Sequence, residues 1–303
     1  KALSSICITS DASDDVRYAA SELQKYINKI TGISLQINGA KSIGNKIMIN
    51  DCFEDAPNGS FKIHAIGDSI LKIEGSGRGV VYAIYDFLEY LGCRYYDANA
   101  LLIPQLSQIK VDTNYNKIWK PIFSTRDVYY ASTRDSLYID WHRQNHSTNG
   151  RRKEWGLWVH TLPGLLSADE YFKDHPEYFA MRNGKRVATQ LCLSNPEVLT
   201  IVASNLKKLI DKSPSIKYWS VSQGDNLAYC ECDKCSAMNT IDGSPTGSVI
   251  QFTNMVADRF PNKVISTLAY QYSQKPPVVT KPRSNVNIML CAVDCDRSKP
   301  ILS

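Results

Sequence analysis

The chain has 303 residues, of which 43% are hydrophobic and 21% charged, so it has ample material for a core and an ordinary globular composition. It holds no run of about 18 apolar residues, which excludes a membrane-spanning helix. The formal charge is +5, and Lys and Arg lie among acids rather than in a stripe, which excludes nucleic acid as a partner.

The first 117 residues are predicted to form a compact α+β domain. Residues 4–9 alternate like a strand, and a helix follows whose apolar residues recur every three or four positions from Val16 to Ile30. Short strand-like segments come next, separated by glycine-containing turns. A second helix is predicted over residues 79–91, with its apolar residues on one face.

From residue 118 onward the pattern alternates between strand and helix. The predicted strands cover residues 122–129, 155–161, 190–193, 218–222, 264–268 and 286–291, and the predicted helices cover residues 137–146, 196–211 and 248–260. Such alternation indicates an α/β fold, and a TIM-like (β/α)8 barrel is the commonest large solution. Six strands are fewer than the eight that a barrel needs. We therefore expect residues 118–303 to hold the first six or so strands of an incomplete barrel.

The acidic loop that follows strand 218–222, the fourth in this count, carries the candidate catalytic residue, Asp225. Barrel enzymes place catalytic side chains at the C-terminal ends of their strands. Polar residues at the ends of strands are therefore predicted to bind substrate on the same rim: Arg126, Asp127, His160, Gln223 and Asn226. A carboxylic acid can protonate a leaving oxygen, and Arg or His can hold hydroxyl groups.

Each of these residues also has a structural interpretation. Arg126 and Asp127 could form an internal ion pair, His160 could bind a backbone carbonyl, and Asp225 could cap a turn. The sequence leaves these alternatives open.

Three of the nine cysteines form the motif Cys230-x-Cys232-x-x-Cys235, whose spacing is typical of zinc sites. A structural zinc ion requires four ligands, and the chain has no second Cys-x-x-Cys. Cys291, Cys295 or a histidine could complete a structural zinc site, while a disulfide and reduced thiols are the alternatives. The other cysteines, Cys192 among them, lie mostly in apolar runs and are predicted to be small buried side chains. No cofactor is expected for catalysis.

Residues 175–186 are predicted to form a polar hairpin, because Asn183-Gly184 is a strong turn signal. The chain holds 17 Tyr and five Trp, and flat amphipathic rings suit stacking on sugars. Tyr178 or Phe179 could form such a platform, or the hairpin could be a structural flap.

Four stretches resemble a bacterial family known as domain of unknown function 4838, part of which is classed as glycoside hydrolase family 163. They are residues 79–96, 175–186, 190–198 and 225–235. The first stretch is similar to the small domain that precedes the barrel in β-hexosaminidases and α-glucuronidases.

This resemblance implies a TIM-barrel glycoside hydrolase that is periplasmic, cell-surface or secreted and acts on host or dietary glycans. The characterised branch resembles retaining endo-β-N-acetylglucosaminidases that cut the core of N-linked glycans. In the related α-glucuronidases the acid is a Glu between Ser and Gly, whereas this chain has Ser222-Gln223-Gly224. Asp225 would therefore have to take the role.

Members of the family also extend well beyond residue 303, in keeping with the strand count. Within the chain, Asp294 is the candidate for a second carboxylate. The alternative is a non-catalytic glycan-binding or scaffold protein with a degenerate barrel. The Gln at the expected acid position and the missing strands favour this alternative.

Overall fold

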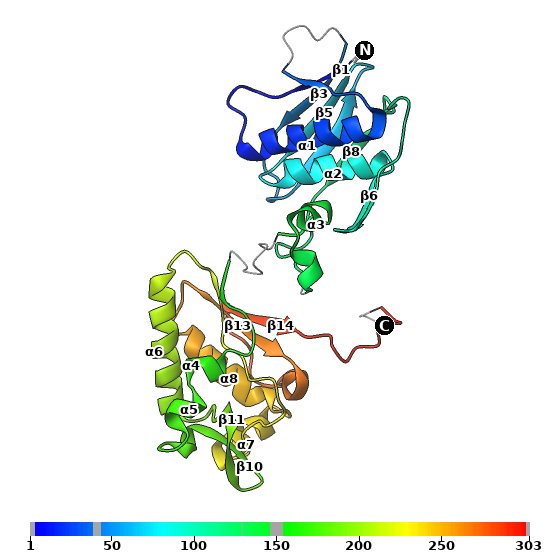
Figure 1. The fold of residues 1–303 in the computed structure, drawn as a ribbon. Helices are drawn as coiled ribbons and strands as arrows, with labels where there is room; N and C mark the ends of the chain where they lie inside the picture. Colours follow the sequence, from blue (N-terminus) through cyan, green and yellow to red (C-terminus); the bar gives the residue numbers. More distant parts are fainter. Residues whose placement is uncertain (1–3, 39–43, 129, 146–153, 301–303) are drawn as a thin grey trace. The chain divides into compact units, whose positions relative to one another are not determined.

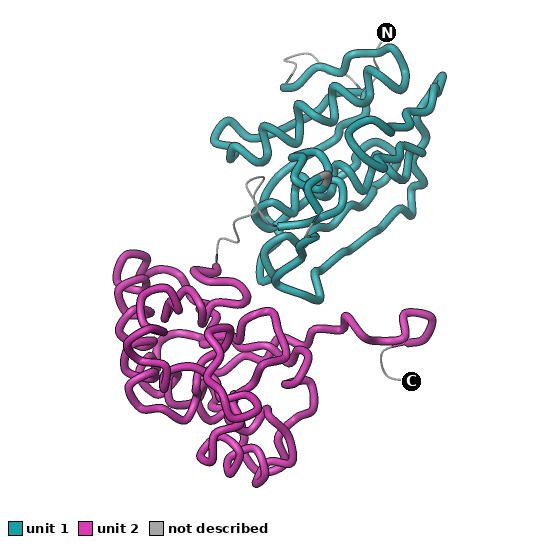
Figure 2. The backbone as a smooth tube through the Cα atoms, turned by 60° about the horizontal axis from the view of Figure 1, so that its bottom comes forward, with its two compact units in different colours: residues 1–152 teal, residues 153–303 magenta. Residues whose placement is uncertain are grey.

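The computed structural model describes residues 4–38, 44–128, 130–145 and 154–300. The chain forms two compact units, residues 1–152 and residues 153–303 (Figure 2). The first unit is a mixed sheet covered by two helices, and the second is built on a parallel sheet.

The first unit has a six-stranded sheet in the order β2-β1-β3-β5-β4-β8. Its strands are β1 (Ser4–Cys7), β2 (Gln36–Ile37), β3 (Asn45–Asn50), β4 (Phe61–Ile66), β5 (Ile70–Gly75) and β8 (Asn116–Trp119). Pairing is parallel from β2 to β5, and β4 is antiparallel to both of its neighbours. Helices α1 (Asp14–Thr31) and α2 (Gly79–Tyr90) lie side by side on one face of the sheet (Figure 1). The predicted α+β architecture of this region is confirmed.

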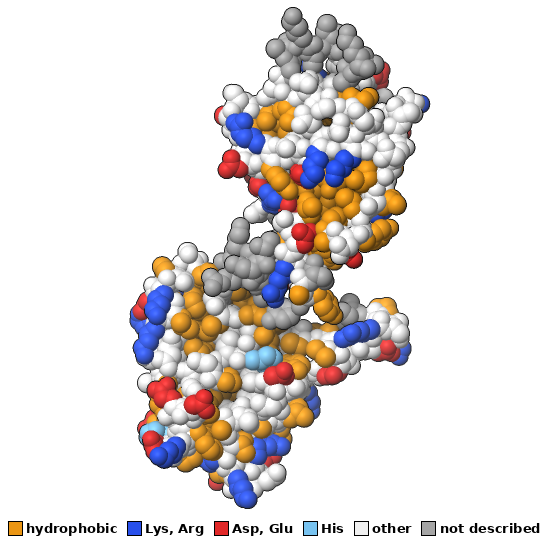
Figure 3. Space-filling model, in the orientation of Figure 1, with side chains coloured by type: hydrophobic (Ala, Val, Ile, Leu, Met, Phe, Trp, Pro, Cys, Tyr) orange, Lys and Arg blue, Asp and Glu red, His pale blue; other side chains and the backbone are white. Residues whose placement is uncertain are grey.

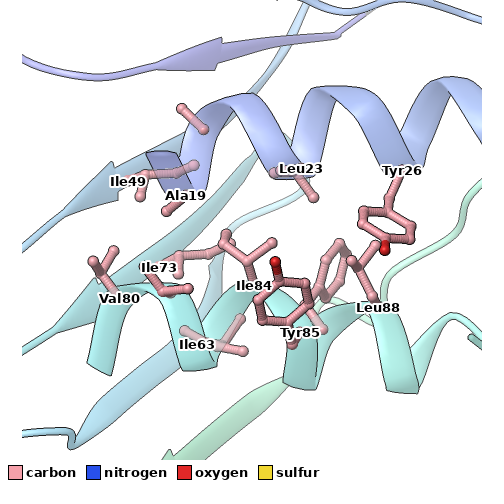
Figure 4. Close-up of a cluster of buried hydrophobic side chains, with 14 of the residues drawn as sticks. Ala19, Leu23, Tyr26, Ile49, Ile63, Ile73, Val80, Ile84, Tyr85 and Leu88 are labelled. Atoms are coloured by element: carbon pink, nitrogen blue, oxygen red, sulfur yellow. The ribbon is translucent and has the colours of Figure 1, made fainter. Parts of the chain in front are cut away.

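The core of this unit lies between the two helices and the sheet (Figure 4). Leu23 and Tyr26 of α1 face Ile84 and Leu88 of α2, as the 3.6-residue spacing requires. Ser13 caps α1 by accepting a hydrogen bond from the Val16 amide at 3.4 Å.

Trp141 explains why the first unit extends to residue 152 instead of the predicted 117. Trp141 closes α3 (Ser136–Trp141) and is 1% exposed. Its ring centroid lies 5.8 Å from that of Tyr26, 4.8 Å from Tyr85 and 5.9 Å from Tyr95. The residues after 117 thus supply part of the first core. They include the 3-10 helix η1 (Ala131–Arg134). Earlier in the chain, β6 (Arg94–Asp97) and β7 (Ala100–Leu102) form a separate hairpin.

The predictions for residues 122–146 need correction. No strand occurs over the described part of residues 122–129, where the backbone is irregular. The predicted helix over 137–146 shortens to α3, which ends before Arg143, a residue with a positive φ of 54°. Residue 146 lies outside the described residues.

The second unit has a four-stranded parallel sheet in the order β14-β13-β12-β9. Its strands are β9 (Trp155–Leu157), β12 (Tyr218–Ser220), β13 (Val264–Ala269) and β14 (Val286–Leu290). Helices α6 (Pro196–Lys212) and α8 (Thr246–Ala257) bury apolar side chains in the same core as Trp219 and Ile265. The α/β class is confirmed. Over the described residues the sheet is open, so the closed barrel is not observed.

The predicted third strand belongs to a hairpin instead of the parallel sheet. Strands β10 (Phe179–Arg182) and β11 (Lys185–Leu191) are antiparallel around the Asn183-Gly184 turn. Tyr178 and Phe179 are 6% and 1% exposed. Both rings belong to the core, so of the two alternatives for this hairpin the structure favours the structural flap over the sugar platform. The remaining short elements are α4 (Leu162–Leu165), α5 (Ala168–Tyr171), η2 (Pro176–Tyr178), α7 (Asp233–Ile241) and η3 (Gln271–Ser273).

The described residues contain no helix long and apolar enough to cross a membrane. On the face drawn in Figure 3, described acidic and basic side chains are intermixed on both units. This mixing agrees with the charge pattern of the sequence.

Asp242 ties α7 to the segment that precedes β14 and gives a prediction about stability. Its buried carboxylate accepts hydrogen bonds from the amides of Val279 (2.9 Å) and Thr280 (2.6 Å) and from the Thr280 hydroxyl (2.6 Å). Burial raises the pKa of Asp242, but the hydrogen bonds from Thr280 and Val279 outweigh burial, and the pKa lies below 3.8. The stabilisation is therefore complete above pH 3.8 and declines as the pH falls toward the lowered pKa.

We expect Asp242→Asn to lower the free energy of unfolding by about 2 kcal/mol at pH 6 and by less at pH 3. Urea unfolding at the two pH values measures this difference. Asp258→Asn is the matched control, because Asp258 pairs with Arg283 at the surface (3.0 Å), and such pairs contribute only about 0–1 kcal/mol. An equal loss at both pH values for Asp242→Asn would contradict the assignment.

Candidate active site

Asp225 lies in the loop that leaves the C-terminal end of β12, and its side chain is exposed. Beyond the end of β12, the Ser222 amide donates to the Thr161 hydroxyl at 3.1 Å. Leu162 N–H in turn donates to Ser222 O at 3.0 Å. These bonds bring the chain after β9 beside the chain after β12. The acidic loop therefore leaves the edge of the sheet where parallel α/β folds bind ligands.

Two residues from the end of the next strand hold the Asp225 carboxylate. Tyr270 follows β13, and its hydroxyl donates to Asp225 Oδ1 at 2.9 Å. Gln271 Nε2 lies 3.5 Å from the same oxygen. The hydrogen bond to Asp225, together with partial desolvation, raises the pKa of Tyr270, so this phenol remains a donor at neutral pH.

His160 occupies the adjoining position at the end of β9. Its Nδ1 lies 2.9 Å from Gln223 O, and its ring centroid lies 5.7 Å from that of Tyr270. His160 and Gln271 have φ values of 55° and 50°. Such left-handed conformations cost energy in residues other than glycine and gather at functional sites. His160 thus bonds to a backbone carbonyl, as its structural interpretation predicted, and also lies beside Tyr270, which holds Asp225.

The side-chain amides of Gln223 and Asn226 form hydrogen bonds to other residues of the protein. Gln223 is 1% exposed, and its Nε2 donates to Tyr270 O (3.2 Å) and Ser273 Oγ (2.7 Å). Asn226 donates to Thr189 O at 3.1 Å and accepts from the Ala228 amide at 3.0 Å. These partners make both residues supports for the loops around Asp225. The predicted contact of either residue with substrate stays a prediction.

The Gln190 side chain holds the backbone of the acidic loop in place. This side chain of β11 is 4% exposed and donates to Gly224 O (2.8 Å) and Asn226 O (3.2 Å). Its Oε1 accepts from the Gly224 amide at 3.0 Å. Three hydrogen bonds from one side chain thus hold the residues on either side of Asp225.

Asp294, the candidate second carboxylate, is linked to the same turn as Asp225. It is exposed, follows β14, and its Oδ2 accepts from Gln274 Nε2 at 3.2 Å. Gln271 and Gln274 stand three residues apart at the η3 turn, and side chains with this spacing project from the same side of a 3-10 helix. Side-chain amides at the η3 turn thus contact both carboxylates: Gln271 contacts Asp225, and Gln274 contacts Asp294.

Arg126 and Asp127 belong to the first unit, whereas the other predicted rim residues belong to the second. The Arg126 side chain donates to Arg143 O (2.6 Å) and Phe123 O (2.8 Å), and its guanidinium carbon lies 5.5 Å from the Trp119 ring centroid. These contacts give Arg126 a structural role within the first unit. A substrate contact of Arg126 or Asp127 stays a prediction.

The residues that the sequence interpretation missed are Tyr270, Gln271 and Gln190. The first two follow β13 directly, so the rule of strand ends that selected His160 would also have selected them. Gln190 gave no such signal, because its role depends on a long-range contact between the hairpin and the acidic loop.

A second group of chemically active side chains lies in the same unit. The thiols of Cys192, Cys230, Cys232 and Cys235 all lie within 4.8 Å of one another. Cys192, which was predicted to be a small buried side chain, is thus the fourth member in place of Cys291, Cys295 or a histidine. Hydrogen bonds from Cys230 and Cys235 lower the pKa of the Cys192 thiol. Four thiols in this arrangement could hold a metal ion.

A hollow of about 490 Å³ lies in the first unit, next to Ile33 and Leu71. Among the described residues that line it, Asp68 is the one acidic residue. The chemistry of the side chains therefore favours the Asp225 loop as the candidate site.

Residues 95–303 match the sequence model of a family described as Domain of unknown function (DUF4838). Among curated proteins there is no match. A solved structure of a GH115 4-O-methyl-α-glucuronidase with specificity for decorated arabinogalactans is 9% identical, with 94% of this chain and 44% of that chain covered and a TM-score of 0.49.

The GH20 β-N-acetylhexosaminidase from Streptomyces coelicolor A3(2) is 11% identical, with 97% and 66% covered and a TM-score of 0.49. The N-acetyl-β-hexosaminidase of Streptomyces plicatus is 12% identical, with 96% and 65% covered and a TM-score of 0.45. The chain thus spans less than two thirds of each of these three proteins, and the likenesses are distant.

Proposed function

The chain belongs to the family described as Domain of unknown function (DUF4838), and we propose that it is a glycoside hydrolase whose general acid, or acid/base, is Asp225. The observation that supports this proposal is the exposed Asp225 carboxylate at the ligand-binding edge of a parallel sheet, with Asp294 bonded to the same turn. Most glycosidases act with a pair of carboxyl groups that flank the scissile bond.

In the proposed reaction, protonated Asp225 gives its proton to the glycosidic oxygen as the bond to the anomeric carbon breaks. The leaving sugar departs as an alcohol. A carboxylate such as Asp294, or the N-acetyl group of the substrate, attacks the anomeric carbon in a retaining reaction, and water later replaces it. Tyr270 orients Asp225. His160 directs its Nδ1–H at the Gln223 carbonyl, so the neutral ring offers Nε2 as an acceptor for a sugar hydroxyl.

The proposed substrate is a glycan met outside the cytoplasm, by a protein that is periplasmic, cell-surface or secreted. The finer proposal is a retaining endo-β-N-acetylglucosaminidase that cuts the core of N-linked glycans, and it rests on the sequence resemblance alone.

The test is to incubate the protein with N-linked glycopeptides and to measure new reducing ends, beside a glycan array that measures binding. Release of reducing ends supports the hydrolase. Binding without release would assign the protein to the alternative class of glycan-binding or scaffold proteins.

Tyr270→Phe removes the hydroxyl that orients Asp225 and keeps the ring next to His160. A hydrogen bond to a charged group contributes roughly 1.5–3 kcal/mol, so we expect kcat to fall at least about tenfold with little change in KM. Steady-state kinetics measure both constants. Tyr272→Phe is the matched control, since that ring lies beside Tyr229 (5.3 Å). Equal effects of the two variants would contradict an orienting role for Tyr270.

A further inference from the structure

We propose that Cys192, Cys230, Cys232 and Cys235 bind one zinc ion, and that this ion fastens helix α7 and the acidic loop to the end of strand β11. The proposal rests on the arrangement of the four thiols and on the packing around them. It is independent of the proposed hydrolase activity.

The four sulfur atoms have the spacing of a mononuclear tetrahedral site. Zn–S bonds of about 2.3 Å in a tetrahedron place the sulfurs about 3.8 Å apart. Cys192 Sγ lies 3.6 Å from Cys232 Sγ and 4.0 Å from Cys235 Sγ, and the largest separation within the group is below 4.8 Å. Three of the four residues are buried, and Cys232 is half-buried.

The surroundings suit negatively charged sulfur. The Met181 amide points at Cys230 Sγ (3.3 Å), and Ser194 Oγ lies 3.5 Å, 3.6 Å and 3.2 Å from the sulfurs of Cys192, Cys232 and Cys235. Cys232 also stands at the N-cap of α7, where the helix dipole favours a thiolate. Hydrogen bonds of this kind commonly support metal ligands.

The ligand set selects zinc among the metals. Thiolate ligands in a tetrahedron favour zinc or iron, and the affinity order of divalent metals places zinc above iron. All four ligands are sulfurs, which leaves no position for water, as in structural zinc sites. Each thiol that becomes a ligand loses its proton to the solvent.

Apolar packing alone contributes little to holding α7 against the rest of the unit. Cys235 is the only buried residue of this nine-residue helix, and isolated helices of that length are unstable in water. The small core around it consists of Ala180 and thiols, with Met181 and Val187 at its border. A metal ion would supply the attachment that this core lacks.

The C-terminal end of β11 holds the acidic loop at two places, through Gln190 and through Cys192. Gln190 and Cys192 stand two residues apart at the C-terminal end of β11. Gln190 binds the backbone beside Asp225, and Cys192 joins the cysteines that follow it. Loss of the ion would release one of these two anchors and loosen the segment that carries Asp225.

The first experiment measures metal in the full-length protein, purified without chelator. We expect one equivalent of zinc by elemental analysis in the native protein and in Cys52→Ser, which replaces an exposed cysteine outside the group. Cys192→Ser should retain less than a tenth of the zinc. Absence of zinc, one equivalent of iron in its place, or full retention in Cys192→Ser would overturn the proposal. So would a mass lower by two hydrogens, which indicates a disulfide.

The second experiment does not depend on a variant that folds. Zinc is withdrawn from the native protein with a chelator, and amide hydrogen exchange is followed by mass spectrometry. We expect peptides covering residues 224–241 to exchange at least about tenfold faster, those of α1 to stay unchanged, and added zinc to restore protection. Unchanged exchange in residues 224–241 after complete removal of zinc would overturn the role of the ion as an anchor.

Discussion

Asp225→Asn is expected to lower kcat on natural glycans by about 10²–10⁴-fold, the range typical of a lost general acid. The amide keeps the size of the carboxyl group and can still accept the hydrogen bond from Tyr270. It has no proton to give to the leaving oxygen. The fold and the substrate-binding surface should therefore survive, and KM should change little.

The nature of the leaving group separates an acid from other roles. An aryl glycoside with an acidic phenol departs with little protonation, so the loss caused by Asp225→Asn should shrink on that substrate. Asp294→Asn, if Asp294 is the nucleophile, should impair both substrates alike. Asp233→Asn, at an exposed carboxylate at the start of α7, is the control and should leave kcat unchanged. Near-normal turnover by Asp225→Asn would refute the assignment of the acid.

Local patterns in the sequence predicted the elements whose hydrophobic period is long and unbroken. Helices α2 and α6 lie within two residues of their predicted bounds, and α1 contains the whole apolar repeat from Val16 to Ile30, because each helix buries a continuous apolar face. Strands β12, β13 and β14 were also predicted, since they are short apolar runs. β12 and β13 are mostly buried, whereas β14 is an edge strand on which Ile288 and Leu290 are exposed.

The failures have a different physical cause. Helix α7 buries only Cys235 and therefore has no apolar period to detect. Residues 190–193 have the composition of a buried strand, but tertiary pairing places residues 185–191 in an antiparallel hairpin. Propensity alone cannot separate these two environments.

The candidate site shows the same division. The exposed position of Asp225 in the loop after β12 could be predicted because the residue follows a buried strand, and its catalytic role stays a prediction. Cys192 could not be predicted, because an apolar run with one cysteine is also what an inert core residue looks like. Its partners lie 38 to 43 residues away and meet it only through the hairpin.

Trp141→Ala is expected to destabilise the first unit by about 3–5 kcal/mol, the usual cost of deleting a large buried aromatic side chain. The indole fills the space among Tyr26, Tyr85 and Tyr95. Hydrogen exchange can follow each unit separately. Amides of α1 that exchange through unfolding of this unit should do so about 10²–10⁴-fold faster in the variant, while those of α6 keep their native rates.

The matched control is Tyr130→Ala, because Tyr130 lies near the same segment but is 72% exposed. Removal of an exposed ring changes stability by about 0.5 kcal/mol or less. If Trp141→Ala accelerated exchange only in residues 131–142 and left α1 unchanged, that segment would be an appendage of the first unit. The boundary at residue 117 would then describe the cooperative unit better than the boundary at residue 152, because the aromatic contacts would not couple α3 to the core.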